Sequence, residues 1–407
     1  MHRFSFLCVV VVAALFLWAC NTTSSEPVLP DGDSVDIPEG DAPDNDPADP
    51  DPDPETDVVT DGDAEPDPEP DIPTELDGTE TEADVPAEEP ETDLELIEES
   101  EPDPDADVEP ETPQGELYVS NGMPYIPGGL NVETINLAKN EQGAPVDMLI
   151  FAPKEDGEYA VVVFQHGFLM ANHYYTSVLT HLASHGFIVA APQMYTPGGL
   201  PIGKPNAYEE ALTALSVYDW LPTALSDITG LTARHDRTGL AGHSRGGKVI
   251  WIVLKGDPSY AQAVAGVDPV DGTGGPLGGE VRVVDGDFGF GFPSFVLGTG
   301  KGSELYLGQA CAPIGDNHER FYDASASPAF HVVATYYGHN DMLEDQPSGC
   351  GLECTSCPGG DSRAPMRNLT AGMLVAFFRG ALQGVPSSFD TLTDIDAAPV
   401  VITAEQK

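Results

Sequence analysis

A serine between two glycines, placed where a strand-forming run meets a helix-forming run, constrains this chain more than any other feature. Residues 242–247 read Gly-His-Ser-Arg-Gly-Gly, after the apolar run 238–241 and before the apolar run 248–254. A G-x-S-x-G pattern between a strand and a helix predicts a sharp turn that holds the Ser244 hydroxyl clear of a sheet. Glycines suit the flanking positions because a Cβ there would collide with the neighbouring strand or helix.

The same turn predicts where negative charge on a reacting oxygen would be stabilised. The amide of Arg245 opens the helix, and backbone N–H groups at a helix N-terminus favour a developing oxyanion. A second donor is expected after the buried strand 159–164, where His166-Gly167 makes a tight turn and the amide of Phe168 follows. His166 itself is expected to be structural. A serine with two such amides predicts acyl transfer through a covalent intermediate.

From residue 116 onward the chain alternates between strand-forming and helix-forming segments. This alternation predicts the α/β-hydrolase fold, with a mostly parallel central sheet and helices on both faces. We expect a catalytic domain at 116–390 and a C-terminal tail at 391–407. Beside the strand and helix of the serine turn, strands are expected at 131–138, 146–152, 159–164, 187–191, 261–267, 294–297 and 330–336, and helices at 174–185, 208–225 and 366–382.

A histidine that could activate the serine should follow it in the chain, because this fold orders its triad as serine, acid and histidine. Three histidines do so. His339 comes directly after the last predicted strand, so its loop can reach back to Ser244, and we expect it to be the general base. His331 lies within that strand and His318 in a polar stretch, and both are expected to be structural.

The acid that orients the histidine is less clearly marked. Asp268 ends the strand 261–267, which is the strand after the serine turn, and is the first choice. Glu304 is the main alternative because it follows the next strand, where this fold often keeps its acid. Asp271 and Asp316 are weaker alternatives, and spacing alone does not separate the four.

The first residues read as an export signal. Arg3 precedes an apolar core that ends at Leu17, and this core is too short for a comfortable membrane span. The segment resembles a bacterial lipoprotein signal, in which Cys20 is acylated and becomes the new N-terminus. We therefore expect a signal peptide at 1–19 and attachment to the cell envelope, at the outer membrane or cell surface, with an ordinary secretory signal as the alternative.

An acidic, proline-rich segment follows. Residues 21–115 hold 37 aspartates and glutamates and no lysine, arginine or histidine. Such a segment cannot bury enough apolar surface to offset its ordering entropy, so we expect a disordered tether at 20–115. The whole chain carries a formal charge of −52, which is more negative than the −37 of this segment, so the remaining chain is acidic too. This charge argues against a nucleic-acid partner.

Four cysteines lie in the predicted catalytic domain: Cys311, Cys350, Cys354 and Cys357. An even number in an exported domain favours two disulfides, whose connectivity the sequence does not reveal. The Cys354-x-x-Cys357 spacing also occurs in metal sites, but no second such pair supports zinc. We expect neither a metal nor a cofactor.

The chain resembles the chlorophyllases over roughly residues 145–385, and more distantly the platelet-activating-factor acetylhydrolases and polyester hydrolases. In that family the aspartate of the D-P-V segment and the histidine of the G-H-x-D-M segment complete the triad. The resemblance therefore implies Asp268 and His339 as the partners of Ser244. It rests on 164–168 (FQHGF), 182–193 (LASHGFIVAAPQ), 242–247 (GHSRGG), 266–270 (GVDPV), 317–323 (NHERFYD) and 337–343 (YGHNDML).

The resemblance also implies an activity. Chlorophyllases hydrolyse the phytyl ester of chlorophyll, so we expect a monomeric serine carboxylic-ester hydrolase that forms an acyl-enzyme with a hydrophobic, small-molecule or lipid-like ester. Its contact with a membrane would be the N-terminal lipid anchor alone. Two alternatives remain: a polyester or lipid-ester hydrolase, since one triad serves many esters, and a non-catalytic cell-surface binding protein that keeps the fold.

Overall fold

The computed structural model describes residues 115–200, 203–272, 282–306 and 308–407. The predicted signal peptide at 1–19, the acylation site Cys20 and nearly all of the predicted acidic tether lie outside the described residues. None of the described helices is both long enough and apolar enough to cross a membrane.

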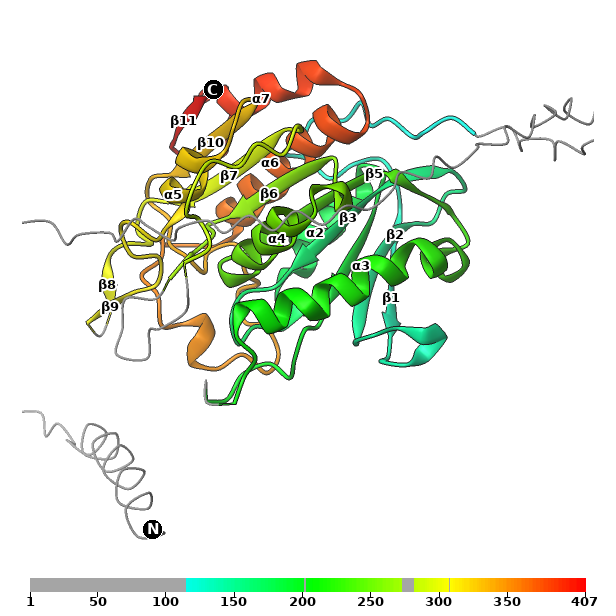
Figure 1. Cartoon of the computed structure of the whole chain (residues 1–407). Helices are drawn as coiled ribbons and strands as arrows, with labels where there is room; N and C mark the ends of the chain where they lie inside the picture. The colour runs from blue at the N-terminus through cyan, green and yellow to red at the C-terminus, as the bar shows by residue number, and fades with distance from the viewer. Residues whose placement is uncertain (1–114, 201–202, 273–281, 307) are drawn as a thin grey trace, which may run out of the picture. The chain divides into compact units, whose positions relative to one another are not determined.

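Nine strands of the described part form one sheet, in the order β1-β2-β4-β3-β5-β6-β7-β10-β11 (Figure 1). The six strands from β4 to β10 in that order pair in parallel, while β1, β2 and β11 join antiparallel at the edges. The sheet is thus mostly parallel, as predicted. The strands are β1 (Val132–Leu137), β2 (Met148–Pro153), β3 (Glu158–Gln165), β4 (Phe187–Pro192), β5 (Thr232–His243), β6 (Ala263–Val267), β7 (Ser294–Thr299), β10 (Ala329–Ala334) and β11 (Ile402–Gln406).

Helices cover both faces of this sheet, which gives the α/β-hydrolase fold. Helices α3 and α4 pack against each other on one face, and α2 and α6 do so on the other (Figure 1). The helices are α2 (Thr176–Ser184), α3 (Ala207–Thr229), α4 (Arg245–Gly256), α5 (His318–Ala324), α6 (Ala364–Leu382) and the short α7 (Asp390–Thr393).

Strand β3 shows why its sequence is continuously apolar. Side chains alternate across a strand, so a strand buried on both faces needs apolar residues at every position. Val161 and Val163 belong to the core under α3 and α4, whereas Val162 and Phe164 belong to the core under α2 and α6. All four are at most 1 % exposed.

The end of the chain differs from the prediction. Residues 391–407 were expected to form a tail, but Leu392 is fully buried and β11 pairs with β10 from Phe330 to Ala334. The β-branched residues Ile402 and Thr403 suit a strand, and pairing satisfies the edge of β10 that would otherwise expose unpaired backbone groups. The folded domain therefore continues to the end of the chain.

Candidate active site

The serine turn has the strained geometry that its sequence predicts. Ser244 stands between β5 and α4 with φ 54° and ψ −122°, a conformation that residues with a side chain rarely adopt. A Cβ on Gly242 would come within 2.5 Å of the Gly246 backbone, and one on Gly246 within 2.4 Å of the Gln165 carbonyl oxygen. Both positions therefore require glycine.

Three side chains from three strand ends form a hydrogen-bonded row. Ser244 Oγ lies 2.8 Å from Nε2 of His339, and Nδ1 of His339 lies 2.6 Å from Oδ2 of Asp268. Asp268 follows β6, and His339 lies in the loop after β10. The row is buried, with exposed fractions of 9 %, 4 % and 0 % for the serine, histidine and aspartate. A carboxylate at Nδ1 requires the proton there, which leaves Nε2 to accept the serine proton.

The surroundings of Asp268 keep it ionised. Burial alone would raise its pKa, but the hydrogen bond and charge of His339 and a hydrogen bond from Thr299 outweigh burial, so the pKa lies below its usual value. The backbone N–H of Thr299 donates to Oδ1 at 3.0 Å and its hydroxyl donates to Oδ2 at 2.8 Å. Asp268 has φ 41°, so its backbone is strained as well.

The alternative acids lie elsewhere. Glu304 is exposed. Asp271 is fully buried but accepts the Nε–H of Arg320 at 3.0 Å and lies 3.7 Å from the ammonium of Lys248, so it belongs to an internal ion cluster. Asp316 pairs with Arg282 at 2.6 Å.

The remaining histidines after the serine have partners of their own. Nδ1 of His318 lies 2.8 Å from Nε2 of His331, and Nδ1 of His331 lies 2.7 Å from a carboxylate oxygen of Glu405 on β11. Burial lowers the pKa of His318. These contacts fit structural roles, and they leave His339 as the histidine at the serine.

The loop after β3 lies beside Ser244. Phe168 and Ser244 line one cavity, and the guanidinium carbon of Arg245 lies 4.4 Å from the centre of the Phe168 ring. Among the described residues, no hydrogen bond occupies the Phe168 amide, whereas the next amide, of Leu169, donates to the Tyr195 hydroxyl at 3.0 Å. The Phe168 amide is thus a candidate donor beside the serine.

His166 has a structural position. Its Nδ1–H donates to the Gly167 carbonyl at 2.8 Å, and its Nε2 accepts the Met194 amide at 3.0 Å. Burial lowers the pKa of His166 to about 4, so the ring stays neutral. These bonds hold the loop that precedes Phe168.

A cavity of about 370 Å³ opens at Ser244 and His339. Its walls are mainly apolar near the serine, and part of its rim is the small hairpin of β8 (Leu305–Tyr306) and β9 (Gln309–Ala310). The other lining residues are Phe168, Leu169, Met170, Asn340, Cys311, Glu353, Ser356 and Cys357.

The four cysteines form two disulfides, as predicted. Cys311 pairs with Cys357, and both line the cavity, so this bond ties the hairpin to the segment that contains Cys357. Cys350 pairs with Cys354. The CxxC cysteines therefore have different partners. Cys350, Glu353 and Cys354 are close enough to suggest a metal site, but sulfurs in a disulfide are not thiolate ligands.

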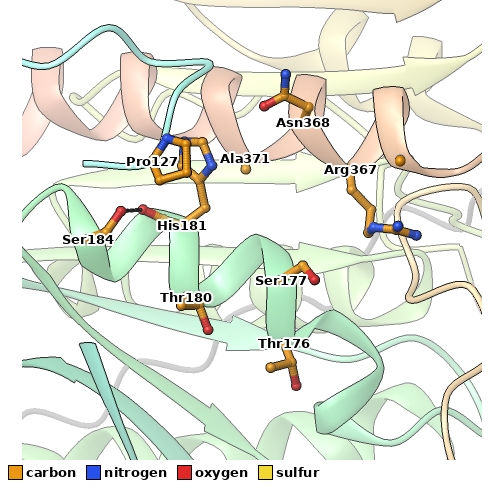
Figure 2. A pocket seen from close by; sticks show the side chains of 10 residues that line it. Pro127, Thr176, Ser177, Thr180, His181, Ser184, Arg367, Asn368 and Ala371 are labelled. Carbon is orange, nitrogen blue, oxygen red and sulfur yellow. Dashed lines mark hydrogen bonds between the residues drawn. The ribbon is translucent and has the colours of Figure 1, made fainter. Parts of the chain in front are cut away.

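A second, larger cavity of about 450 Å³ lies between α2 and α6, away from the serine (Figure 2). Among its lining residues, His181 donates a hydrogen bond from Nε2–H to the Pro124 carbonyl oxygen at 2.8 Å. The Ser184 hydroxyl donates to the His181 carbonyl oxygen at 2.6 Å. Arg367 pairs with Asp345. These polar groups are engaged within the fold, so this cavity is not the candidate site.

Sequence reasoning missed several residues around the serine. Thr299, at the end of β7, was not named, although its place beside the end of β6 could have marked it. Tyr175 and His243 were missed as well: Nε2 of His243 lies 2.8 Å from the His339 carbonyl oxygen, and Nδ1 of His243 lies 2.8 Å from the Tyr175 hydroxyl oxygen. No local pattern identifies Tyr175, which lies 69 positions before the serine.

A strained serine at a strand-to-helix turn, with a histidine and an acid from later strand ends, defines the chain as an α/β-hydrolase. The family model for chlorophyllase matches residues 123–407. Chlorophyllase-1, chloroplastic, of Citrus unshiu is 38 % identical over 266 residues, covering 63 % of this chain and 79 % of the relative. Chlorophyllase-2 of Arabidopsis thaliana is 34 % identical over 255 residues, covering 59 % and 79 %. The chain belongs to the chlorophyllase family and is a carboxylic ester hydrolase.

Proposed function

We propose that this enzyme hydrolyses hydrophobic carboxylic esters through Ser244, His339 and Asp268. The observation that carries the proposal is the unbroken row from Ser244 Oγ through the imidazole to Asp268, at 2.8 Å and 2.6 Å, in the wall of the cavity. Ser244 attacks the ester carbonyl while Nε2 of His339 takes its proton. The imidazolium then donates that proton to the leaving alkoxide, which departs as the alcohol.

The amides of Phe168 and Arg245 hold the oxyanion during both steps. The Arg245 amide opens α4, and the Phe168 amide lies in the loop that follows β3, a central strand of the sheet. Water, deprotonated by His339, then attacks the acyl-enzyme and releases the carboxylic acid. Asp268 stays ionised throughout and stabilises the imidazolium.

The cavity and the relatives support the proposed substrate class. Phe168, Leu169, Met170 and Ala310 make an apolar lining that favours a hydrophobic acyl or alkyl group. The relatives are named chlorophyllases, and we extend to this chain the hydrolysis of a bulky apolar ester of that type.

An ester panel tests the proposal. The full chain should hydrolyse p-nitrophenyl esters, and turnover should be measured also on chlorophyll and on a polyester to define the natural class. Ser244→Ala should remove turnover while circular dichroism stays unchanged. Persistent turnover in this variant would remove Ser244 from the mechanism, and a wild-type chain inactive on every ester would favour the binding-protein alternative.

We also propose that the enzyme is an exported monomer, attached to the cell envelope by a lipid on Cys20. The support is the sequence alone: an apolar core ending at Leu17, followed by Cys20 and the acidic segment. Cells grown with labelled palmitate should label the wild type but not Cys20→Ser. An unlabelled wild type would favour the secretory alternative, and gel filtration would check the monomer.

A further inference from the structure

A row of buried polar groups that the proposed mechanism does not use joins the loop after β3 to the loop after β10. The Gly167 amide donates to the Tyr175 hydroxyl oxygen at 3.0 Å, and that oxygen lies 2.8 Å from Nδ1 of His243. Nε2 of His243 lies 2.8 Å from the carbonyl oxygen of His339. Tyr175 and His243 are 1 % and 0 % exposed, so water does not compete for these groups.

The chemistry of the partners assigns every proton in this row. A carbonyl oxygen only accepts, so the Nε2–H of His243 donates to His339. Burial, reinforced by the neighbouring His339, lowers the pKa of His243 to about 3, so its Nδ1 carries no proton and can accept one. The Tyr175 hydroxyl also lies 2.9 Å from Sδ of Met170, but a thioether is a weak acceptor, so the hydroxyl donates to Nδ1 of His243. The Tyr175 oxygen in turn accepts the Gly167 amide. All donors point the same way, from the oxyanion loop toward the base.

The row ends at the Gly167 amide and at the His339 carbonyl, and each end adjoins a group that the proposed mechanism uses. Gly167 is bonded to Phe168, whose amide we assign to the oxyanion, and the His339 carbonyl belongs to the residue that activates Ser244. We infer that Tyr175 and His243 are positioning residues that hold the oxyanion donor and the general base in register. This inference rests on the proposed function of the site.

The packing around the row supports this role. A Cβ on Gly167 would come within 2.9 Å of Nδ1 of His243, so the loop backbone lies directly against the ring. The rings of His243 and His339 have centres 4.7 Å apart, and those of His243 and Tyr175 are 5.7 Å apart. His243 also directly precedes Ser244 in the sequence. The row is therefore linked to the loop of Phe168, to His339 and to the serine turn.

Tyr175→Phe tests the inference with the least disturbance, because it removes one oxygen and leaves the ring. Loss of the hydroxyl should lower kcat about 10- to 100-fold, as expected for a small misplacement of reacting groups, with KM changed less than about twofold. The matched control is Tyr159→Phe. Tyr159 is equally buried and donates to the Glu155 carbonyl at 2.8 Å, but it lies at the opposite end of β3.

Both variants should stay folded at the assay temperature, which thermal unfolding would check, while the Tyr159→Phe control should keep the wild-type kcat. A folded Tyr175→Phe enzyme that turns over like the wild type would overturn the inference. So would a rise in KM with kcat unchanged, because that pattern means weaker substrate binding.

A second pair of variants separates a connected row from independent contacts. His243→Gln keeps an amide donor near Nε2 and should retain more kcat than His243→Leu, which has no donor. Combining His243→Gln with Tyr175→Phe should lower kcat little below that of the worse single variant. Either substitution already breaks the connection between the two loops, so the second removes little more. Losses that multiply would contradict the inference.

Ser244→Ala distinguishes failure of the proposed function from failure of the positioning role. Turnover in Ser244→Ala would overturn the proposed function itself. An inactive Ser244→Ala beside a fully active Tyr175→Phe would overturn only the positioning role of Tyr175 and His243. All variants are assayed as the full chain on the same p-nitrophenyl ester, over a range of concentrations that gives kcat and KM separately.

Discussion

At the residue scale, the site depends on backbone strain that the surroundings hold in place. Ser244 and Asp268 both have positive φ, at 54° and 41°. Such conformations cost roughly 1–3 kcal/mol each and persist only where packing and hydrogen bonds over-determine them. For Asp268 the restraint is visible, since Thr299 donates two hydrogen bonds to its carboxylate. The strain directs both side chains toward His339.

Asp268→Asn should lower kcat by roughly 10³- to 10⁴-fold, because an amide does not hold the imidazole in the tautomer that accepts the serine proton. Stopped-flow or steady-state turnover of a p-nitrophenyl ester would measure the loss. Glu304→Gln is the control and should change kcat less than about twofold, since Glu304 is exposed. A larger loss from Glu304→Gln than from Asp268→Asn would reverse the assignment of the acid.

At the element scale, the sheet brings Ser244, Asp268 and His339 together, and a disulfide lines the cavity beside them. Strands β5, β6 and β10 deliver the serine, the acid and the histidine at one edge. The hairpin of β8 and β9 is not part of this sheet. Cys311 follows the hairpin directly, so its bond to Cys357 links the hairpin to a second segment that lines the cavity.

Replacing Cys311 and Cys357 by serine should destabilise the domain and widen the cavity. The bond closes a loop with a sequence separation of 46, for which loop entropy predicts about 4 kcal/mol. We expect KM for a bulky ester to rise more than KM for a short one. Replacing Cys350 and Cys354, only 4 apart, should cost about 2 kcal/mol and leave KM unchanged. Equal KM effects from both pairs would contradict the wall role of Cys311–Cys357.

At the scale of the whole molecule, buried neutral histidines link stability to pH. Burial lowers the pKa of His166 to about 4 and of His243 to about 3, while an unfolded histidine titrates near 6.5. The unfolded chain therefore binds more protons between these values, so their contribution is complete above pH 6.5 and is lost as pH falls. Acid should destabilise the domain through these two rings and through other buried histidines, such as His185 and His318, whose pKa burial also lowers.

Urea unfolding at pH 7.5 and pH 5 would measure this effect. Each ring should account for about 2 kcal/mol of lost unfolding free energy at the lower pH. His243→Gln should show a smaller loss between the two pH values than the wild type, because one titrating group is gone. An identical pH dependence in the variant would show that His243 does not titrate on unfolding.

Removing residues 21–115 should leave turnover of a soluble ester within about twofold. The segment has 37 acidic residues and no basic ones, and self-repulsion of this kind opposes packing on an acidic domain. Comparing kcat/KM of the shortened and full chains would test this. A large loss of turnover would mean that the acidic segment takes part in folding or catalysis.

The sequence by itself determined the features that depend on neighbours along the chain. The glycines around Ser244 follow from local sterics, and the buried strand at 159–164 follows from an unbroken apolar run. The position of His339 directly after a strand was also readable, because parallel strands end at one edge of the sheet. These features were enough to predict the fold class, and six longer sequence segments carried the family resemblance.

Only the tertiary structure decided what depends on distance through space. It places Asp268 at His339, which spacing left open and the family resemblance implied, and it places Glu304 in solvent. It also chooses the pairing of four cysteines and adds residues 402–406 to the sheet. It also joins Tyr175 to His243 across 68 positions. Spacing along a chain does not encode these contacts, because the packing of whole strands and helices sets which distant side chains meet.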